Sequence, residues 1–571
     1  MSFAYKLWKI GRILTENEIM DSVYDKAEMA EGEDPQFVNI NFQVLNNEVK
    51  DILYSKNSIS KEKIFFTKKI GGSGDGIYYL YPNLNIRKEN LKKKIIQLVN
   101  TLKSSIRVYA NEQNQKIAEL IFLKFEEIKK YIERAEVELE LIHLKKQYEE
   151  LNESSIHKED GTTAQKIDKK IAKNNEKCTK LIETRNFWDH LLLKLCRYLV
   201  DFPKGNYWLW FSINGKTFYE LMPEVWSNWY ENPVSIRDNL KIGYDAFTNK
   251  VTEVGYKPEV KVFSYDQYHK SMEYRLNENL PLSLESARNI KFAWMYILNN
   301  LVFYYKGLEY IIIPNLISDD AGLYKTVLNR FRRANKKSSE KKSKLEKFNA
   351  QEKGLEKDID KLKKKEKLSK SNNENLNKLV QQSEETLSKI KELDTGMIRE
   401  FDEQLNEVGD IKNSINVDYI FTSINKTNLS FEIKGSIEDV IPSQVRNVVT
   451  EMANYNIRDL VKFGKRDRNE TLLQDFFNRE ELSFILNRSQ KNNGNKILQE
   501  RLYMARLLLT NTKIEIDQLL QRFETNRLLG YDKKKRLTKD GISEWIEFSK
   551  NFTTNENNIY NFLKRLGKIK G

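Results

Sequence analysis

A seven-residue repeat of apolar side chains over residues 345–397 is the strongest constraint on how this chain can fold. Two positions of the repeat form a seam, and ten of the sixteen seam positions are apolar. Such a repeat places one apolar stripe along a helix and is typical of a coiled coil, here an arm extending roughly 80 Å at 1.5 Å per residue. The apolar seam residues are Leu345, Ile359, Val380 and Leu387 at one position, and Phe348, Leu355, Leu362, Leu376, Ile390 and Met397 at the other.

The chain as a whole is too long for one domain and too rich in aromatic side chains to be disordered. It has 571 residues, of which 40% are apolar and 11% aromatic, enough for several cores. Its two cysteines, Cys178 and Cys196, exclude a disulfide scaffold and a cysteine-rich zinc module. We therefore expect an α+β, mainly helical multidomain chain with small β-containing N-terminal and central domains, a long helical coiled-coil arm and a C-terminal helical bundle.

Changes of pattern along the chain predict five segments. Residues 37–45 and 63–69 alternate like strands, Asn214-Gly215 is typical of a β-hairpin turn, and residues 310–314 resemble a buried strand that proline stops. The segments are an N-terminal α/β domain with a glycine-rich loop (1–110), a long helical hairpin with patterns at 112–152 and 163–201 (111–203), a β-hairpin plus helix domain with an apolar helix at 283–305 (204–331), the basic coiled-coil arm (332–411), and two strands at 417–423 and 428–434 before a C-terminal helical bundle (412–571).

A dense aromatic group surrounds the predicted hairpin. Stacking on single-stranded bases is one use of such a group, and packing in a core is the other. We favour core packing because the group accompanies a hairpin. Its members are Trp208, Trp210, Phe211, Trp226, Trp229 and Tyr230.

The net charge of +14 is concentrated in two segments. Residues 332–370 carry 16 basic and 7 acidic side chains, and residues 452–571 carry 24 and 15, so each segment sums to +9. Clustered positive charge is typical of a surface that binds a polyanion, usually nucleic acid. For residues 332–370 we favour a solvated helix face. For residues 452–571 we favour nucleic-acid binding, because apolar and aromatic residues are interleaved with the charges.

Three groups of residues are candidates for contact with DNA. Four glycines fall within six residues after the predicted strand at 63–69, which is more than a tight turn needs, so the loop either approaches a duplex closely or forms a flexible hairpin tip. It is not a P-loop, since the lysines precede the glycines. The candidates are Lys68, Lys69, Gly71, Gly72, Ser73 and Gly74 in the loop, and then Arg458, Lys462, Lys465 and Arg466, and Lys533, Lys534, Lys535 and Arg536, in the C-terminal segment.

One constellation suggests catalysis. Asp418, followed by Glu432 and Lys434 on a predicted strand, fits the pattern of a magnesium-dependent, restriction-like nuclease. The same residues also fit an amphipathic strand with alternating charge, which we favour. The four histidines lack the spacing of metal ligands, so we expect no catalytic residues, no metal site and no cofactor. A coiled-coil scaffold protein without a nucleic-acid partner is a further alternative.

Several stretches, in order along the chain, resemble a known family. They are KIG at 9–11, NYWLWFSINGK at 206–216, VFSYD at 262–266, PLS at 281–283, GLEYIIIP at 307–314 and EDVIPSQVR at 438–446. Together they resemble the large subunit of the type I-B CRISPR surveillance complex, Cascade. Two departures stand out: residues 245–259 lack the paired cysteines of many relatives, and Gln444 replaces the arginine of the family's Pro-Ser-Arg.

The resemblance implies a non-catalytic subunit of an antiviral defence complex, with guide RNA, target DNA, and Cascade backbone and guide-end-binding subunits as partners. It implies that the chain recognises a flanking motif in duplex DNA, helps open the duplex, and transiently recruits a separate helicase-nuclease. It also implies that the C-terminal region is made separately as a small subunit, with internal initiation at Met452 or Met397.

The sequence predicts a cytoplasmic protein with no membrane partner. Lys6 and Lys9 interrupt the apolar N-terminal stretch, which argues against a signal peptide. The longest run without charge, residues 292–305, has 14 residues, whereas a helix needs roughly 20 to cross a bilayer.

Overall fold

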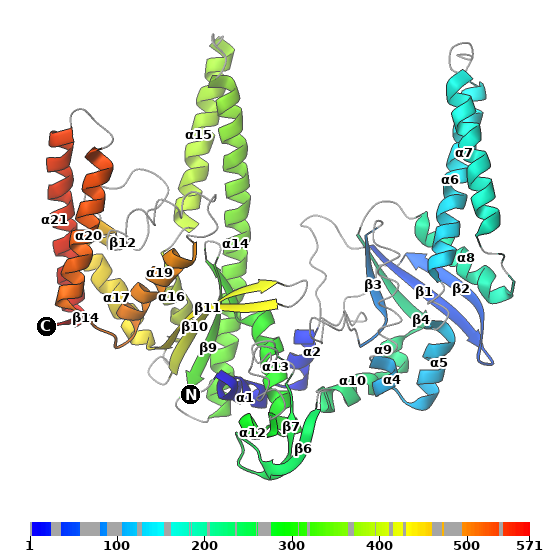
Figure 1. Cartoon of the computed structure of the whole chain (residues 1–571), viewed down its shortest axis with the longest axis horizontal. Coiled ribbons are helices and arrows are strands. Elements are labelled where there is room, and N and C mark those ends of the chain that lie inside the picture. Colours follow the sequence, from blue (N-terminus) through cyan, green and yellow to red (C-terminus); the bar gives the residue numbers. More distant parts are fainter. Residues whose placement is uncertain are drawn as a thin grey trace. The chain divides into compact units, whose positions relative to one another are not determined.

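The computed structural model of the chain divides into two compact units (Figure 1). One is residues 15–291, and the other, called the terminal unit below, combines residues 1–14 with 292–571. The chain is α+β, mainly helical and multidomain, which confirms the predicted fold class. The structure describes residues 3–23, 36–56, 80–87, 105–122, 128–153, 161–181, 183, 185–201, 206–233, 237–258, 260, 276–305, 308–316, 320–363, 370–393, 396–409, 415–425, 430–458, 471–472, 494–535 and 541–571.

The predicted strand at 37–45 and the Asn214-Gly215 hairpin belong to one sheet of the 15–291 unit. Asn214 and Gly215 have positive φ angles of 49° and 83°, as a two-residue hairpin turn requires. After Thr217 the chain becomes helical, so the second arm of the hairpin is shorter than predicted. The predicted strand at 63–69 lies outside the described residues. The sheet order is β2-β1-β4-β3 with β5 paired to β4, and its strands are β1 Gln36–Leu45, β2 Glu48–Lys56, β3 Asn83–Arg87, β4 Asn206–Ile213 and β5 Lys216–Thr217.

Alternation of apolar residues decides which face of this sheet is buried. Phe42 on β1 and Phe211 on β4, which run parallel, stack with ring centroids 6.2 Å apart. Trp226 and Trp229 are also buried, so core packing of the aromatic group is confirmed for these side chains. Both lie on α10, one of the two helices that follow the sheet: α9 Phe218–Leu221 and α10 Pro223–Glu231.

The remaining helices of the 15–291 unit include the predicted helical hairpin. The pattern at 163–201 is not one helix: it ends at Lys180 and restarts at Phe187, because the Asn186 side chain accepts a hydrogen bond from the Asp189 N–H at 2.8 Å and caps a new helix. The elements are α2 Glu16–Val23, α4 Arg107–Tyr109, α5 Glu112–Phe122, α6 Ile128–Glu153, α7 Gly161–Lys180, α8 Phe187–Val200, the β-hairpin β6 Arg237–Tyr244 and β7 Val251–Tyr256, α12 Leu276–Asn279, and the first part of α13 Leu284–Asn300.

A four-stranded antiparallel sheet forms the centre of the terminal unit. The predicted helix at 283–305 ends at Asn300, because the following Val-Phe-Tyr-Tyr favours a strand. Pro314 does not stop its strand but lies inside it, opposite Val417. The two strands predicted at 417–423 and 428–434 are confirmed, and both are longer than expected. The sheet order is β11-β10-β9-β8, with β8 Val302–Tyr305, β9 Leu308–Leu316, β10 Ile415–Asn425 and β11 Ser430–Val440.

The seven-residue repeat forms a helical hairpin and not one extended helix, so the predicted length of roughly 80 Å is wrong. The first helix, α14 Ala321–Lys363, spans roughly 64 Å, and α15 Lys370–Leu393 packs against it (Figure 1). The seam residues Ile359, Ile390 and Met397 are buried, whereas Val380 is exposed. The hairpin is followed by α16 Met397–Asn406.

The C-terminal region is largely helical, as predicted, and packs on the outer strand of the sheet. A Cβ atom at Gly435 of β11 would overlap the Leu502 side chain, which shows how closely α19 approaches the strand. The elements are α17 Pro442–Asn454, β12 Ile457–Arg458, β13 Thr471–Leu472, α19 Gly494–Leu509, β14 Ile514–Glu515, α20 Ile516–Lys535, α21 Gly541–Arg565 and β15 Ile569–Lys570.

Candidate nucleic-acid interface

The structure describes only part of the predicted DNA-binding residues. Arg458 lies half-buried in β12, and Lys533, Lys534 and Lys535 are the last three residues of α20. The other candidates lie outside the described residues: Lys68, Lys69, Gly71, Gly72, Ser73, Gly74, Lys462, Lys465, Arg466 and Arg536.

Much of the described positive charge of the C-terminal bundle has partners inside the protein. The Arg506 guanidinium donates to the Ser436 carbonyl at 2.7 Å, and the Lys570 ammonium lies 2.8 Å from the Glu515 carboxylate. The Lys568 ammonium donates to the Thr510 carbonyl. Burial, together with the charge of Lys513, lowers the pKa of Lys568. These three cations are held against the bundle by contacts within the protein and help to stabilise it.

The basic residues at the start of the arm are also partly neutralised. The Lys341 ammonium lies 3.0 Å from the Glu400 carboxylate and 3.2 Å from that of Glu403, and Lys337 pairs with Glu407. Burial lowers the pKa of Lys341, but the two carboxylates outweigh it and the pKa is raised. Positive charge on α14 therefore holds α16 in place. Our interpretation of this segment as a simple solvated face missed these ion pairs.

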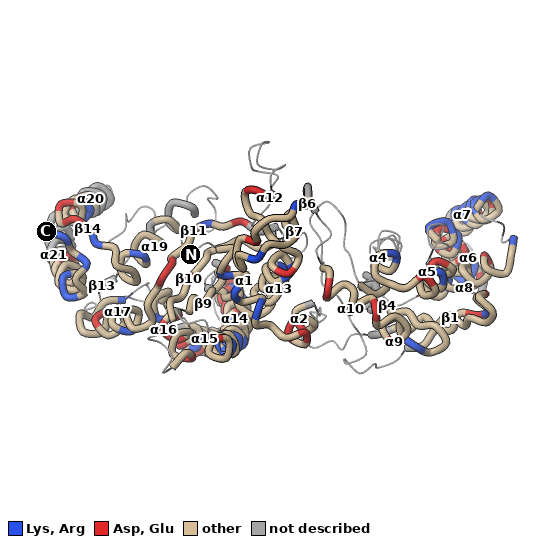
Figure 2. The backbone as a smooth tube through the Cα atoms, turned by 90° about the horizontal axis from the view of Figure 1, so that it is seen from below, with Lys and Arg blue, Asp and Glu red and all other residues tan. Residues whose placement is uncertain are grey.

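A group of exposed lysines lies on α7, which sequence reasoning did not single out (Figure 2). Its lysines recur at intervals of three and four residues, so they share one side of the helix. The signal was present in the sequence, but the helix belongs to a hairpin whose overall charge is close to balanced. The lysines are Lys166, Lys169, Lys170, Lys173, Lys177 and Lys180, and all are exposed.

The residues of the predicted nuclease constellation do not converge. The Asp418 carboxylate accepts a hydrogen bond from the Asp439 N–H at 2.9 Å. Glu432 lies seven residues from Asp439 along the same strand, roughly 20 Å away, and is paired with Ser423. Glu432 is exposed and Lys434 is half-buried. A magnesium ion held by both carboxylates would need their oxygens about 4 Å apart, which this register does not allow.

Asp418 instead forms a buried ion pair with Lys6 of α1 Phe3–Ile13. Burial raises the pKa of Asp418, and the hydrogen bonds from Lys6 and from the Asp439 N–H act in the opposite direction without cancelling that effect. Asp439 has a positive φ of 55°, which presents its N–H to the carboxylate. The pair and this hydrogen bond join the N-terminal helix to β10 and β11.

A second buried carboxylate, Asp245, joins the β6–β7 hairpin to the start of α13. Its oxygens accept hydrogen bonds from the N–H groups of Phe247, Thr248 and Ser283, at 2.7–3.0 Å, and from the Ser286 hydroxyl at 3.0 Å. Burial alone would raise the pKa of Asp245, but the hydrogen bonds led by that from Ser283 lower it to about 2. The residue is an ionised anchor at every physiological pH.

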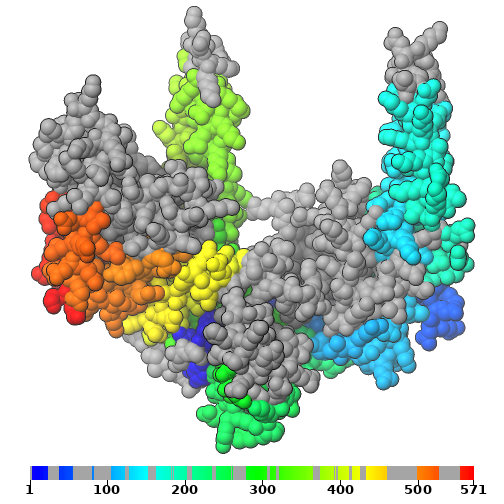
Figure 3. Space-filling model, in the orientation of Figure 1, coloured from blue at the N-terminus to red at the C-terminus, as the bar shows by residue number. Residues whose placement is uncertain are grey.

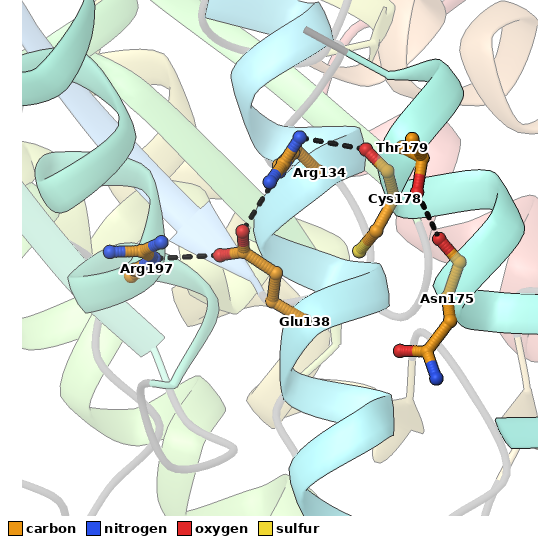
Figure 4. A network of polar contacts seen from close by, with 6 residues as sticks. All are labelled: Arg134, Glu138, Asn175, Cys178, Thr179 and Arg197. Atoms are coloured by element: carbon orange, nitrogen blue, oxygen red, sulfur yellow. Dashed lines mark hydrogen bonds and ion pairs between the residues drawn. The ribbon is translucent and has the colours of Figure 1, made fainter. Parts of the chain in front are cut away.

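The helical hairpin is tied together by a further polar network (Figure 4). Glu138 of α6 accepts from the Arg134 guanidinium at 2.8 Å and from the Arg197 guanidinium of α8 at 2.7 Å, and Arg134 also donates to the Cys178 carbonyl of α7 at 2.7 Å. Burial raises the pKa of Glu138, and the two guanidiniums outweigh it and lower the pKa. The Glu138 carboxylate thus joins α6 to α8, and Arg134 joins the same carboxylate to α7.

Two classes of site find no support in the described part of the chain. Its His, Cys, Asp and Glu side chains form no group of three or more able to hold a metal ion. None of the helices described there is both long and apolar enough to pass through a membrane.

Comparison with known proteins identifies one region of similarity. Residues 261–373 match the family model of the central domain of the CRISPR-associated protein TM1802. The matched range contains α12, α13, the strands β8 and β9, all of α14 and the first four residues of α15. No curated protein matches the chain. The match therefore supports a CRISPR-associated protein.

Proposed function

We propose that this chain is the non-catalytic large subunit of a type I-B CRISPR effector complex. In this role it binds target duplex DNA beside the protospacer, recognises the flanking motif, and assists guide-directed strand opening. The observation that carries the proposal is the match of residues 261–373 to the central domain of a CRISPR-associated protein.

Further support comes from the places of the stretches that resemble the large-subunit family. The stretch at 206–216 contains β4 and its hairpin turn, and the stretch at 307–314 contains the buried centre of β9. The stretch at 438–446 connects β11 to α17, and Asp439 within it bonds to Asp418, which pairs with Lys6 near the opening stretch. The stretches at 206–216, 307–314 and 438–446 each contribute buried residues to the core of their unit.

The absence of catalysis is part of the proposal and has its own support. The separation of Asp418 from Glu432 removes the nuclease constellation that the sequence offered. Cleavage is then the task of a helicase-nuclease that the complex recruits. Glu432→Ala should leave duplex binding intact, and the wild-type protein with magnesium should leave the duplex uncut. Magnesium-dependent cleavage that Glu432→Ala abolishes would contradict this part.

The proposed partners are a guide RNA, target DNA, and the backbone and guide-end-binding subunits of the complex. Purification of the chain with its natural neighbours tests this directly. We expect a short RNA of uniform length and a stack of repeated backbone subunits to copurify with it. Recovery of the chain without RNA from cells that express all its neighbours would contradict membership of such a complex.

A further inference from the structure

The lysines of α7 form a stripe on one side of the helix. Successive residues turn by 100° around an α-helix, so the six lysines fall within an arc of about 100°. From Lys166 to Lys180 the stripe covers 15 residues, whose 14 rises amount to roughly 21 Å of helix length. The name lysine stripe is used below for Lys166, Lys169, Lys170, Lys173, Lys177 and Lys180.

The lysine stripe faces away from the rest of the hairpin. The half-buried residues of α7, among them Ile167, Ile171 and Cys178, occupy the opposite arc, and α7 packs against α6. The α6–α7 hairpin projects from the body of its unit, and its visible face is uncovered by other parts of that unit (Figure 3). All six lysine side chains are exposed, so a large ligand can reach the stripe.

Little negative charge opposes the lysine stripe. Among the described residues, the ion pair that involves one of these six lysines joins Lys180 to Glu176. The second acidic residue of α7, Asp168, lies about 150° around the helix from the centre of the stripe. The sequence of α6, by contrast, contains seven acidic and five basic residues. The hairpin thus separates its charges between two helices, whereas an ordinary solvated helix interleaves them.

We propose that the lysine stripe binds the phosphate backbone of duplex DNA. B-form DNA carries one negative charge per roughly 1.7 Å of axis, so 21 Å of duplex presents about 12 phosphates, enough for every lysine of the stripe. Lysine is a point charge that binds phosphate without reading bases, so the contact is independent of sequence. The choice of DNA as the polyanion rests on the proposed function. The observation that positive charge is concentrated on one side of α7 is independent of the proposed function.

The test compares two variants of the full chain that lose the same charge from the same hairpin. One carries Lys166→Gln, Lys170→Gln, Lys173→Gln and Lys177→Gln on the stripe. The control carries Lys129→Gln, Lys130→Gln, Lys145→Gln and Lys146→Gln on α6, all of which are exposed in the wild type. Circular dichroism establishes that both retain the wild-type helix content.

Binding of a labelled duplex of about 25 base pairs is measured by fluorescence anisotropy between about 50 and 200 mM salt, where phosphate contacts dominate the salt dependence. Each lost phosphate contact reduces the slope of log K against log salt by about 0.9. We expect the stripe variant to lose about 3.6 from the slope and to bind at least about tenfold more weakly at low salt. The control should change the slope by less than about 1.

The outcomes separate this inference from the proposed function. If the wild-type chain does not bind the duplex, either alone or within the RNA-loaded complex, the inference and the proposed function are both overturned. A wild type that binds while the stripe variant keeps its affinity and slope overturns the inference alone. A stripe variant that keeps duplex binding but fails to join the complex shows that the stripe contacts a protein subunit, and that also overturns the inference.

Discussion

Asp245 illustrates how a single carboxylate can determine the local fold. It is fully buried, and its two oxygens accept hydrogen bonds from the loop that closes the β6–β7 hairpin and from the first turn of α13. Removing it leaves the buried Ser283 N–H and Ser286 hydroxyl without this acceptor, each costing about 1–3 kcal/mol, and two half-buried N–H groups lose it as well. The connection between hairpin and helix depends on this side chain more than on the sequence of the loop.

Asp245→Ala should therefore destabilise this part of the chain by about 3 kcal/mol or more. Hydrogen exchange read out by mass spectrometry should show faster exchange in β6, β7 and the start of α13. Asp320→Ala is the matched control, because the Asp320 side chain also accepts from two N–H groups at a helix start but is exposed. Its effect should stay near 1 kcal/mol. Equal effects of the two substitutions would contradict the assigned importance of burial.

The same anchor predicts how this region responds to acid. The pKa of Asp245 is about 2 in the folded chain, whereas the ordinary pKa of an aspartate side chain is 3.8. The folded state therefore favours the ionised form. Its contribution to stability is fully present above about pH 4 and is lost as the pH falls from about 4 through 2. Exchange of α13 should accelerate over this window in the wild type. In Asp245→Asn the same segment should show a weaker dependence on pH, and an identical profile would contradict the assignment.

Residue patterns predicted local geometry well and long-range partners poorly. Asn214-Gly215 was predicted to turn because both residues tolerate positive φ, and they do. Asp418 was grouped with Glu432 because they are close in sequence and both acidic. Its real partner is Lys6, 412 residues away, which no spacing rule can find. A buried ion pair between distant segments depends on the tertiary fold, and the sequence of either segment alone does not contain it.

At the scale of elements, the arm shows why periodicity finds helices but not their breaks. The seven-residue repeat is real, and the helices α14 and α15 carry it. The repeat does not reveal that the chain reverses between Lys363 and Lys370, because an antiparallel hairpin and a continuous helix use the same apolar spacing. Inside the hairpin, the Glu352 carboxylate accepts from the Ser383 hydroxyl at 2.6 Å across the two helices.

In the hairpin the seam residues differ in burial, so substituting them should change the stability of the arm by different amounts. Ile390 is 1% exposed, whereas Val380, an equally apolar seam residue, is 36% exposed. Ile390→Ala should destabilise the arm by about 2–4 kcal/mol because it leaves a cavity, and Val380→Ala should cost under about 1 kcal/mol. Hydrogen exchange of α15 in the two variants is the measurement. Similar losses of protection would favour the continuous coiled coil that the repeat alone suggests.

Strand and helix were confused where composition and context disagree. Residues 302–305 continue an apolar run, so periodicity extended the preceding helix over them, but their aromatic and β-branched side chains favour β8. Pro314 has no N–H to donate, yet it lies within β9 between two neighbouring residues that pair with β10. The neighbouring strand determines whether the position of Pro314 needs an N–H donor. The sequence of β9 alone therefore does not show that a proline is tolerated there.

At the scale of the whole molecule, the terminal unit is assembled from distant parts of the chain. In its sheet β9 pairs with β10, although the helices α14, α15 and α16 separate the two strands along the sequence. The ion pair of Lys6 with Asp418 joins the N-terminal helix to the same sheet. The 15–291 unit is inserted between residue 14 and residue 292. Composition shifts mark where patterns change, but they do not show that the two ends of the chain share one core.

This assembly bears on the proposed small subunit made from the C-terminal region. A product that begins at Met452 would keep only the last three residues of α17 and none of β11. It would lose the contact of Leu502 with Gly435 and the hydrogen bonds from Arg506 to Ser436 and from Gln444 to Leu508. Two leucines of α19 that are at most 2% exposed, Leu502 and Leu508, would be uncovered. Such a product would lack the surface on which its helices pack.

Initiation at Met397 preserves these contacts. Met397 is the first residue of α16, directly after its N-cap Gly396, and a product from this point has 175 residues and retains β10, β11, α17 and α19. We therefore predict that a separately made small subunit, if produced, begins at Met397. Intact-mass measurement of the natively expressed complex distinguishes the two starts by the mass of residues 397–451. Substituting Met397 by leucine should remove the shorter species and leave the full chain. A species that begins at Met452 would contradict the argument from packing. A full-length chain with no shorter species would show that no internal product is made.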